Sequence, residues 1–158
     1  MFDLDGNGSL NRTAWTEPDE RLAFLVLDRN ANGTIDDGIE LFGASTPQPA
    51  STEPNGFLAL AMLDDRAVGG NGDGRLTSED ELFNLLNLWI DANHDGQSQA
   101  SELMSLGEAG VQSVKLDYVI SNRRDRHGNL LRYKTLVRMS DRVVEAVDVL
   151  FAQADSEP

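Results

Sequence analysis

Asp, Asn and Gly recur at alternate positions in four short segments of the chain, which is the pattern of a calcium-binding loop. Calcium takes about six to eight oxygen ligands, and a loop can supply them from side chains at positions 1, 3 and 5 and from the backbone carbonyl at position 7. Glycine at position 6 permits the sharp turn, and a carboxylate near position 12 closes the site. The four segments therefore predict calcium sites, with about three or four ions in all.

The fourth segment fits the whole frame. The turn residue is Gly96, and position 8, which is usually aliphatic, is Ser98, so pairing with another loop should be unusual. The predicted ligands are Asp91, Asn93, Asp95, the carbonyl of Gln97, and Glu102.

The second segment fits the early positions and closes one residue late. Position 12 is Ile39, and the nearest acid is Glu40, while Asp36 or Asp37 could also contribute. The predicted ligands are Asp28, Asn30, Asn32, the carbonyl of Thr34, and Glu40. Since two of them are neutral amides, the affinity should depend on the later acids.

The third segment lacks an acid at position 1, where Gly69 stands. Asp64 precedes a glycine-rich insertion, residues 65–70, and could loop back to serve. The predicted ligands are Asp64, Asn71, Asp73, the carbonyl of Arg75, and Asp80.

The first segment has Asp3, Asp5, Asn7 and Ser9 in the frame, but Ala14 at position 12. Its closing acid must come from elsewhere, with Glu17 and Asp19 as candidates.

Ordinary Asx-turns would explain a single such segment without any metal. Four in one chain, three of them with a nearby closing acid, favour metal binding. Magnesium is the weaker candidate because it resists dehydration and demands a stricter octahedron.

Composition excludes several other classes of function. The chain has 158 residues, no cysteine and a net charge of -14, which rules out disulfides and thiolate zinc sites and would repel a nucleic-acid backbone. No apolar run is long enough to span a membrane. Neither His94 nor His127 suggests a catalytic triad, and we predict no catalytic residue.

Two smaller features outside the loops admit simple interpretations. Arg123, Arg124, Arg126 and Arg132 either balance charge in a hairpin or form a docking patch for an acidic partner. Trp15 and Trp89 are expected to anchor the core beside the loops.

The segments that position the loops predict an α+β fold. Residues 55–63 and 78–90 carry apolar side chains at helical spacing, and a short helix is expected over 102–106. Residues 22–27 could form a helix or a strand.

The pattern changes near residue 111, where a small antiparallel sheet is expected to begin. The predicted strands cover 111–120, 131–139 and 143–151, with a turn at 126–129. We therefore expect short helices around EF-hand-like calcium loops in residues 1–110 and a β extension packed on them in residues 111–158, as one compact domain.

Ordered motifs give the chain a family resemblance. They are Phe2-Asp-Leu-Asp-Gly, Leu27-Asp-Arg-Asn, Asn32-Gly-Thr-Ile-Asp-Asp-Gly-Ile-Glu40-Leu-Phe-Gly43, Asn55-Gly-Phe-Leu-Ala-Leu60 and Leu88-Trp-Ile-Asp-Ala-Asn-His-Asp-Gly96. Over residues 2–106 they resemble a calcium-binding module of secreted bacterial repeat-in-toxin (RTX) proteins, especially the self-processing modules of iron-regulated RTX proteins. The C-terminal sheet resembles extensions in related bacterial exported proteins.

This resemblance implies that calcium folds the module, which then promotes cleavage of an Asp-Pro bond just before it and joining of the freed aspartyl to a lysine. The five prolines of this chain follow Glu17, Thr46, Gln48, Glu53 and Glu157, so it contains no Asp-Pro bond. The family's leading Asp-Pro segment and first acidic loop are also missing. Self-cleavage would need a bond outside this chain.

The sequence thus favours a calcium-dependent folding module of a larger secreted bacterial protein, exported without a cleaved N-terminal signal in this chain. Its expected partners are calcium ions, the remainder of a parent chain and a possible protein partner. The alternatives are a self-processing module of the parent and a dockerin-like protein-binding module. Dockerins carry two matched repeats, whereas the spacing between these loops is irregular.

Overall fold

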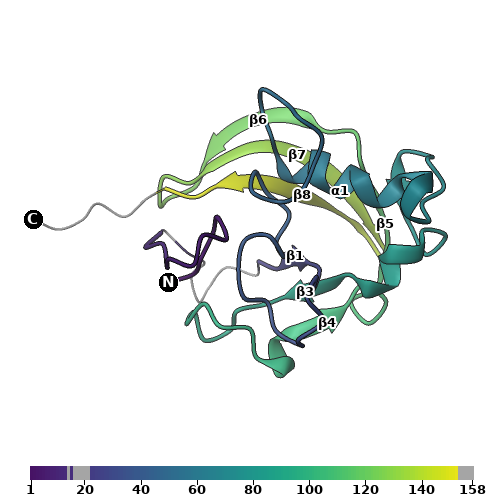
Figure 1. Cartoon of the computed structure of the whole chain (residues 1–158). Coiled ribbons are helices and arrows are strands. Elements are labelled where there is room, and N and C mark those ends of the chain that lie inside the picture. The colour runs from purple at the N-terminus through teal and green to yellow at the C-terminus, as the bar shows by residue number, and fades with distance from the viewer. Residues whose placement is uncertain (14, 16–21, 153–158) are drawn as a thin grey trace, which may run out of the picture.

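The computed structural model describes residues 1–13, 15 and 22–152, which form two antiparallel sheets (Figure 1). The smaller sheet has the strand order β1-β3-β4. Its strands are β1 (Phe24–Val26), β3 (Asn87–Trp89) and β4 (Leu103–Ser105). Trp89 lies in the middle strand and pairs with Phe24 on one side and Leu103 on the other.

The larger sheet has five strands, and its longest strand, β7, pairs with three others. Its members are β2 (Arg75–Leu76), β5 (Val111–Lys115), β6 (Val119–Arg124), β7 (Leu130–Met139) and β8 (Val143–Leu150). β2 occupies positions 7 and 8 of the third loop and pairs with β5, so the loop region contributes a strand to the C-terminal sheet.

The α-helix of the described residues is α1 (Gly56–Ala61). Asn55 caps it, because its side-chain oxygen accepts the N–H groups of Phe57 and Leu58, both at 3.0 Å. The remaining helical turns are 3₁₀: η1 (Met62–Asp64), η2 (Arg66–Val68), η3 (Glu81–Leu85) and η4 (Ala100–Glu102).

The predicted α+β class, with short helices around the loops, is wrong, because the described residues are mainly β. The predicted helix over 78–90 is a 3₁₀ turn followed by β3, and the one over 102–106 is largely strand β4. Both segments are too short to form stable helices by themselves, and tertiary packing decides their conformation. Pairing on both edges of β3 satisfies its backbone while Trp89 becomes fully buried.

Three local expectations have clear outcomes. Residues 22–27, left open between helix and strand, contain strand β1. The helix expected after Asn55 is confirmed as α1. The strand expected over 111–120 is two strands, β5 and β6, which pair with different parts of β7.

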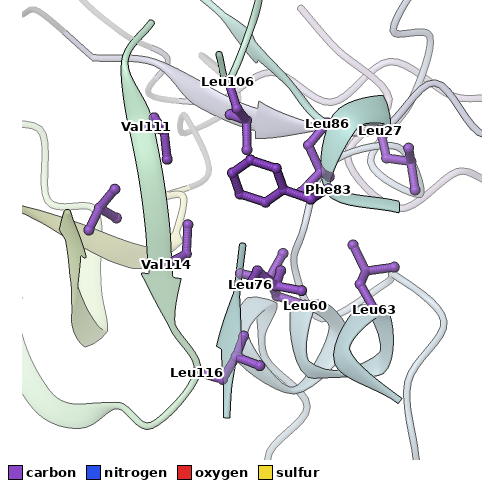
Figure 2. Packing of buried hydrophobic residues seen from close by; sticks show 11 residues of the cluster. Leu27, Leu60, Leu63, Leu76, Phe83, Leu86, Leu106, Val111, Val114 and Leu116 are labelled. Carbon is purple, nitrogen blue, oxygen red and sulfur yellow. The ribbon is translucent and has the colours of Figure 1, made fainter. Parts of the chain in front are cut away.

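Two apolar clusters hold these elements together. The larger one joins α1 and the 3₁₀ turns to the five-stranded sheet, and Figure 2 shows Leu60 and Leu63 facing Val114 across Leu76. The smaller cluster lies under the loops and is built around Trp89. It contains Phe2, Val26, Ile35, Leu41 and Trp89, with Trp15 and Phe24 packed against it.

Candidate metal centres

The candidate loops connect paired strands or bridges, and three of them are closed by an antiparallel backbone bond at their base. These bonds run from Ile90 N to Glu102 O (2.9 Å), from Leu27 N to Glu40 O (2.9 Å) and from Asn11 N to Phe2 O (2.9 Å). A β-type closure thus brings the start and the end of each loop together, as the helices of an EF-hand would do.

The glycine at position 6 makes the same contact in all four loops. Each has a positive φ between 72° and 85°, a conformation that strongly favours glycine, and each donates its N–H to the aspartate at position 1. The bonds are Gly8 to Asp3 (2.7 Å), Gly33 to Asp28 (2.8 Å), Gly74 to Asp64 (2.8 Å) and Gly96 to Asp91 (3.0 Å).

Except for Asp5 of the first loop, the side chains at positions 3 and 5 each accept the backbone N–H of the residue two positions further along the chain. At position 3 the acceptors are Asn30 for Asn32 N (3.0 Å), Asn71 for Asp73 N (2.9 Å) and Asn93 for Asp95 N (3.0 Å). At position 5 they are Asn7 for Ser9 N (2.8 Å), Asn32 for Thr34 N (2.9 Å), Asp73 for Arg75 N (2.9 Å) and Asp95 for Gln97 N (2.7 Å). The recurring bonds fix one oxygen of each side chain and so orient the whole group.

In the fourth loop, the closing acid lies over the start of the loop as the frame requires. Glu102 accepts the N–H of Ala92, at position 2, at 3.0 Å. Oδ2 of Asp95 accepts a hydrogen bond from the side-chain amide of Asn93 at 3.0 Å. These bonds tie Glu102 to the start of the loop and Asn93 to Asp95.

In the second loop, the acid that folds back over the start of the loop is Glu40, one residue beyond position 12. Glu40 accepts the N–H of Arg29 at 3.0 Å with one oxygen and the N–H of Asp36 at 2.8 Å with the other. Asp36 itself accepts the side-chain amides of Asn32 and Asn30, and these bonds lower its pKa. Asp36 thus faces two of the predicted amide ligands.

The third loop brings Asp64 back across its insertion. Asp64 accepts the N–H of Gly72 at 2.8 Å as well as that of Gly74, so it stands where an aspartate at position 1 would stand. Asp80, which is fully buried, accepts the N–H of Asn71 at 3.0 Å.

The first loop uses a side chain that the sequence analysis missed. Asn11, at position 9, accepts the N–H of Leu4 at 2.8 Å, which is the contact that Glu102 makes in the fourth loop. Asp5 is bonded through the side-chain amide of Asn7 at 2.8 Å. The candidate closing acids Glu17 and Asp19 lie outside the described residues.

Opposing effects act on the first aspartate of this loop. Burial raises the pKa of Asp3, but hydrogen bonds from the N–H groups of Gly8, Asn7 and Gly6 and the interaction with Asp5 together outweigh it, and the net pKa is lowered. The charged form is therefore favoured at neutral pH.

Five loop acids are buried: Asp3, Glu40, Asp64, Asp80 and Asp91 are 8%, 3%, 6%, 0% and 4% exposed. Backbone N–H groups, together with the ring N–H of Trp15 at Asp91, satisfy hydrogen bonds of these carboxylates. Arg29 interacts electrostatically with Glu40. The ion pairs of lysine and arginine at Asp117, Asp141, Glu145 and Asp148 lie outside the loops. A buried negative charge is costly unless it is paired, and a bound cation would supply that pairing.

The ligand set of each loop mixes acids with neutral oxygens. Among residues 1–13, 15 and 22–152, no group of three or more His, Cys, Asp or Glu side chains is placed to hold a metal. Any ion bound in a loop would therefore also depend on Asn side chains and backbone carbonyls.

Three loops are joined to one another. The hydroxyl of Ser98 accepts the N–H of Ile35 at 2.6 Å and donates to its carbonyl at 3.4 Å, which links position 8 of the fourth and second loops. Gly38 donates its N–H to the carbonyl of Asp3 at 2.7 Å, linking the second loop to the first. The unusual residue at position 8 thus makes the loop pairing through its side chain.

The two tryptophans link the smaller apolar cluster to the fourth loop. The ring N–H of Trp15 donates to Asp91, and that of Trp89 donates to Glu102 at 3.4 Å. The rings lie 5.8 Å apart between centroids. The sequence predicted both as core anchors but gave no sign of their bonds to the loop acids.

Comparison with known proteins places this arrangement in a family. Residues 1–152 match the SPM domain. The chain belongs to the SPM-domain family. Iron-regulated protein FrpA of Neisseria meningitidis serogroup C is 38% identical over 157 residues, which are 99% of this chain and 14% of FrpA. The predicted relation to iron-regulated bacterial proteins is confirmed, and the chain spans only a small part of the relative's length.

Outside the loops, two arginines of the basic cluster of this SPM domain, Arg123 and Arg132, form ion pairs with acids of the C-terminal sheet. Arg132 pairs with the buried Asp148 at 2.9 Å and donates to the carbonyl of Pro54 at 2.7 Å. Arg123 pairs with Glu145 at 3.2 Å. These contacts fit the charge-balancing interpretation for both residues. No helix in the described part of the SPM domain is long and apolar enough to cross a lipid bilayer.

Proposed function

We propose that this SPM domain is a calcium-binding module that folds as it binds calcium and forms part of a larger exported bacterial protein. The observation that carries the proposal is the position-1 aspartate, held by a position-6 glycine in all four loops. Asp64 reaches this geometry from a different sequence position than the other three. Such agreement supports one shared role for the loops.

The chemistry of the donor set supports calcium over other metals. Every predicted ligand offers oxygen, from carboxylates, side-chain amides or backbone carbonyls, and hard cations prefer oxygen. The chain has no cysteine to favour zinc or copper. Magnesium would need a near-ideal octahedron, whereas calcium tolerates the unequal closures of these four loops.

Asx-turns without a metal do not explain why the closing acids lie near the start of their loops. An Asx-turn requires one side chain and the amide that follows it. Here Glu40, Asp80 and Glu102 also return to accept amides near the start of their loops, and the first two are buried. A cation between the two ends would offset the charge that this arrangement concentrates.

Calcium-dependent folding would suit an exported protein, because the chain would fold only where calcium is abundant. A chain with a net charge of -14 repels itself, and bound divalent ions would reduce that repulsion. Ions that bind the folded state but not the unfolded state stabilise it by mass action. We infer that the domain stays unfolded at low intracellular calcium and folds outside the cell.

Thermal unfolding followed by circular dichroism tests this proposal. In millimolar calcium we expect a cooperative transition, and in excess chelator a transition at a much lower temperature or none. Glu102→Gln should need more calcium for the same stability, whereas Asp117→Asn, in a surface ion pair with Lys115, should not. Equal melting temperatures with calcium and with chelator would rule the proposal out.

Self-processing is a second candidate, for a longer parent chain only. The motif resemblance of residues 2–106 to self-processing modules favours it, but the chain itself has no Asp-Pro bond to cleave. An Asp-Pro segment fused before Met1 and incubated with calcium provides the test. Fragments that appear only with calcium would support this role, and a fusion that stays intact would count against it.

A further inference from the structure

An apolar groove of about 470 Å³ lies on the surface between the second and third loops. The 44–54 segment, α1, η1, η2 and η3 surround it. Its lining residues are Arg29, Pro47, Gln48, Pro49, Ala59, Met62, Leu63, Val68 and Leu82. Met62 and Val68 are 37% and 42% exposed, so apolar surface is open to a partner here.

Two residues that line the groove, Arg29 and Val68, belong to the second loop and to the insertion before the third loop. Arg29 occupies position 2 of the second loop, where its backbone N–H is bonded to the closing acid Glu40. Val68 belongs to η2, in the insertion that Asp64 spans to reach the third loop. The conformations of these two loops therefore set the distance between the walls.

Arg29 gives the groove its single charge among the described residues that line it. Its Nε donates to the carbonyl of Ile39 at 2.9 Å, and its guanidinium carbon lies 5.7 Å from the centre of the Phe42 ring. Within the described part of the chain, its two terminal nitrogens have no hydrogen-bond partner. They are available to a carboxylate, which a guanidinium binds through two parallel bonds.

We propose that the groove binds a peptide segment of a partner protein, with an apolar side chain between Met62 and Val68 and a carboxylate on Arg29. The inference rests on the proposed function, because calcium in the second and third loops would hold the walls in place. Charge complementarity selects the occupant: an apolar peptide without an acid would leave the Arg29 nitrogens unpaired.

Fluorescence anisotropy with labelled synthetic octapeptides tests the proposal. Each probe carries one apolar residue (Leu, Ile, Met or Phe) and one acid (Asp or Glu), separated by one to three serines, and has a twin with Asn or Gln in place of the acid. In millimolar calcium, at least one acidic probe should bind at least about tenfold more tightly than its twin. Chelator should abolish this binding.

Two matched pairs of variants locate the site. Arg29→Gln should remove the preference for the acid, whereas Arg138→Gln, an exposed arginine of β7 outside the groove, should keep it. Val68→Ser should weaken the binding of the acidic probe and of its twin to the same extent. Val119 is an exposed valine of β6, and Val119→Ser should change the binding of neither peptide.

Several results would overturn the proposal. They are binding of no acidic probe, equal binding of acid and amide twins, or a preference that survives Arg29→Gln. If the protein forms a dimer in calcium and Val68→Ser makes it monomeric, a second copy of the chain fills the groove instead. Circular dichroism of the same samples separates the two proposals: a protein that folds with calcium but binds no probe contradicts only the groove, and one indifferent to calcium contradicts the proposed function.

Discussion

The loop aspartates and glycines show how far single residues could be predicted. The fourth loop followed from spacing alone, and Asp64 was correctly placed beside the third loop because the insertion that follows it is rich in glycine. Asn11 was missed, since an amide at position 9 carries no signal for closing a loop. The bond from Trp15 to Asp91 was also missed, because it joins residues 76 positions apart in the chain.

Glu102 should be the most sensitive residue of the fourth loop. Replacing it with Gln removes a charged oxygen at the closing position while keeping the size of the side chain. We expect calcium affinity at this loop to fall at least about tenfold, or about 1.4 kcal/mol. Isothermal titration calorimetry measures the loss, and Asp117→Asn serves as the exposed control. An unchanged titration would remove Glu102 from the set of ligands.

Acid should weaken the C-terminal sheet through Glu145. Lys134 lies 2.6 Å and Arg123 3.2 Å from its carboxylate, and chiefly the bond from Lys134 lowers its pKa below the usual 4.5. The folded state therefore binds this proton less readily than the unfolded state, so the stabilisation is present above about pH 4.5 and is lost as the pH falls through the lower folded pKa.

In Glu145→Gln, the free energy of unfolding should accordingly fall less steeply as the pH is lowered. Urea unfolding between neutral pH and about pH 3 measures it at saturating calcium. The variant should differ from the wild type near neutral pH by a small amount, because the pairs are exposed, and the two should converge in acid. Parallel curves over the whole range would contradict the assigned pKa shift.

At the scale of elements, the sequence identified the loops better than the segments beside them. Leu82, Leu85, Leu86 and Trp89 follow a helical period, but β3 is a strand because β1 and β4 pair with it on both edges. Such pairing depends on residues distant in the chain and leaves little trace in a local pattern. The C-terminal strands were easier to predict, since β7 and β8 alternate over longer runs and are joined by a short turn.

Gly38 should be essential to the junction of the first and second loops. A Cβ at this residue would lie 1.9 Å from the carbonyl oxygen of Leu4, a backbone atom that cannot move without displacing the first loop. We expect Gly38→Ala to destabilise the protein by about 1–3 kcal/mol. In Gly43→Ala, the matched control, the added methyl meets no atom within 4 Å.

Calorimetry or urea unfolding in calcium compares the two variants. The control should lie within about 1 kcal/mol of the wild type, or be slightly stabilised through the unfolded chain. Equal stabilities for Gly38→Ala and the wild type would mean that the first and second loops are not packed as described.

On the scale of the whole molecule, charge should decide how the protein responds to salt. A net charge of -14 opposes compaction, and both monovalent salt and bound calcium reduce that repulsion. Raising sodium chloride from about 0.01 M to about 0.5 M should therefore increase secondary structure or melting temperature in chelator. The increase should be much smaller once calcium is bound. A salt response equal in both conditions would argue against charge neutralisation by calcium.

The central claim is that the four loops bind calcium, and four glycine amides report on it directly. Gly8, Gly33, Gly74 and Gly96 each donate to the position-1 aspartate of their loop, so bound calcium should change the chemical shift of each. The decisive measurement is a calcium titration of the ¹⁵N-labelled protein followed by two-dimensional NMR. We predict that at least three of the four signals reach a calcium-saturated position that magnesium does not reproduce. Glycine signals that stay in place, or that respond equally to both ions, would contradict the account.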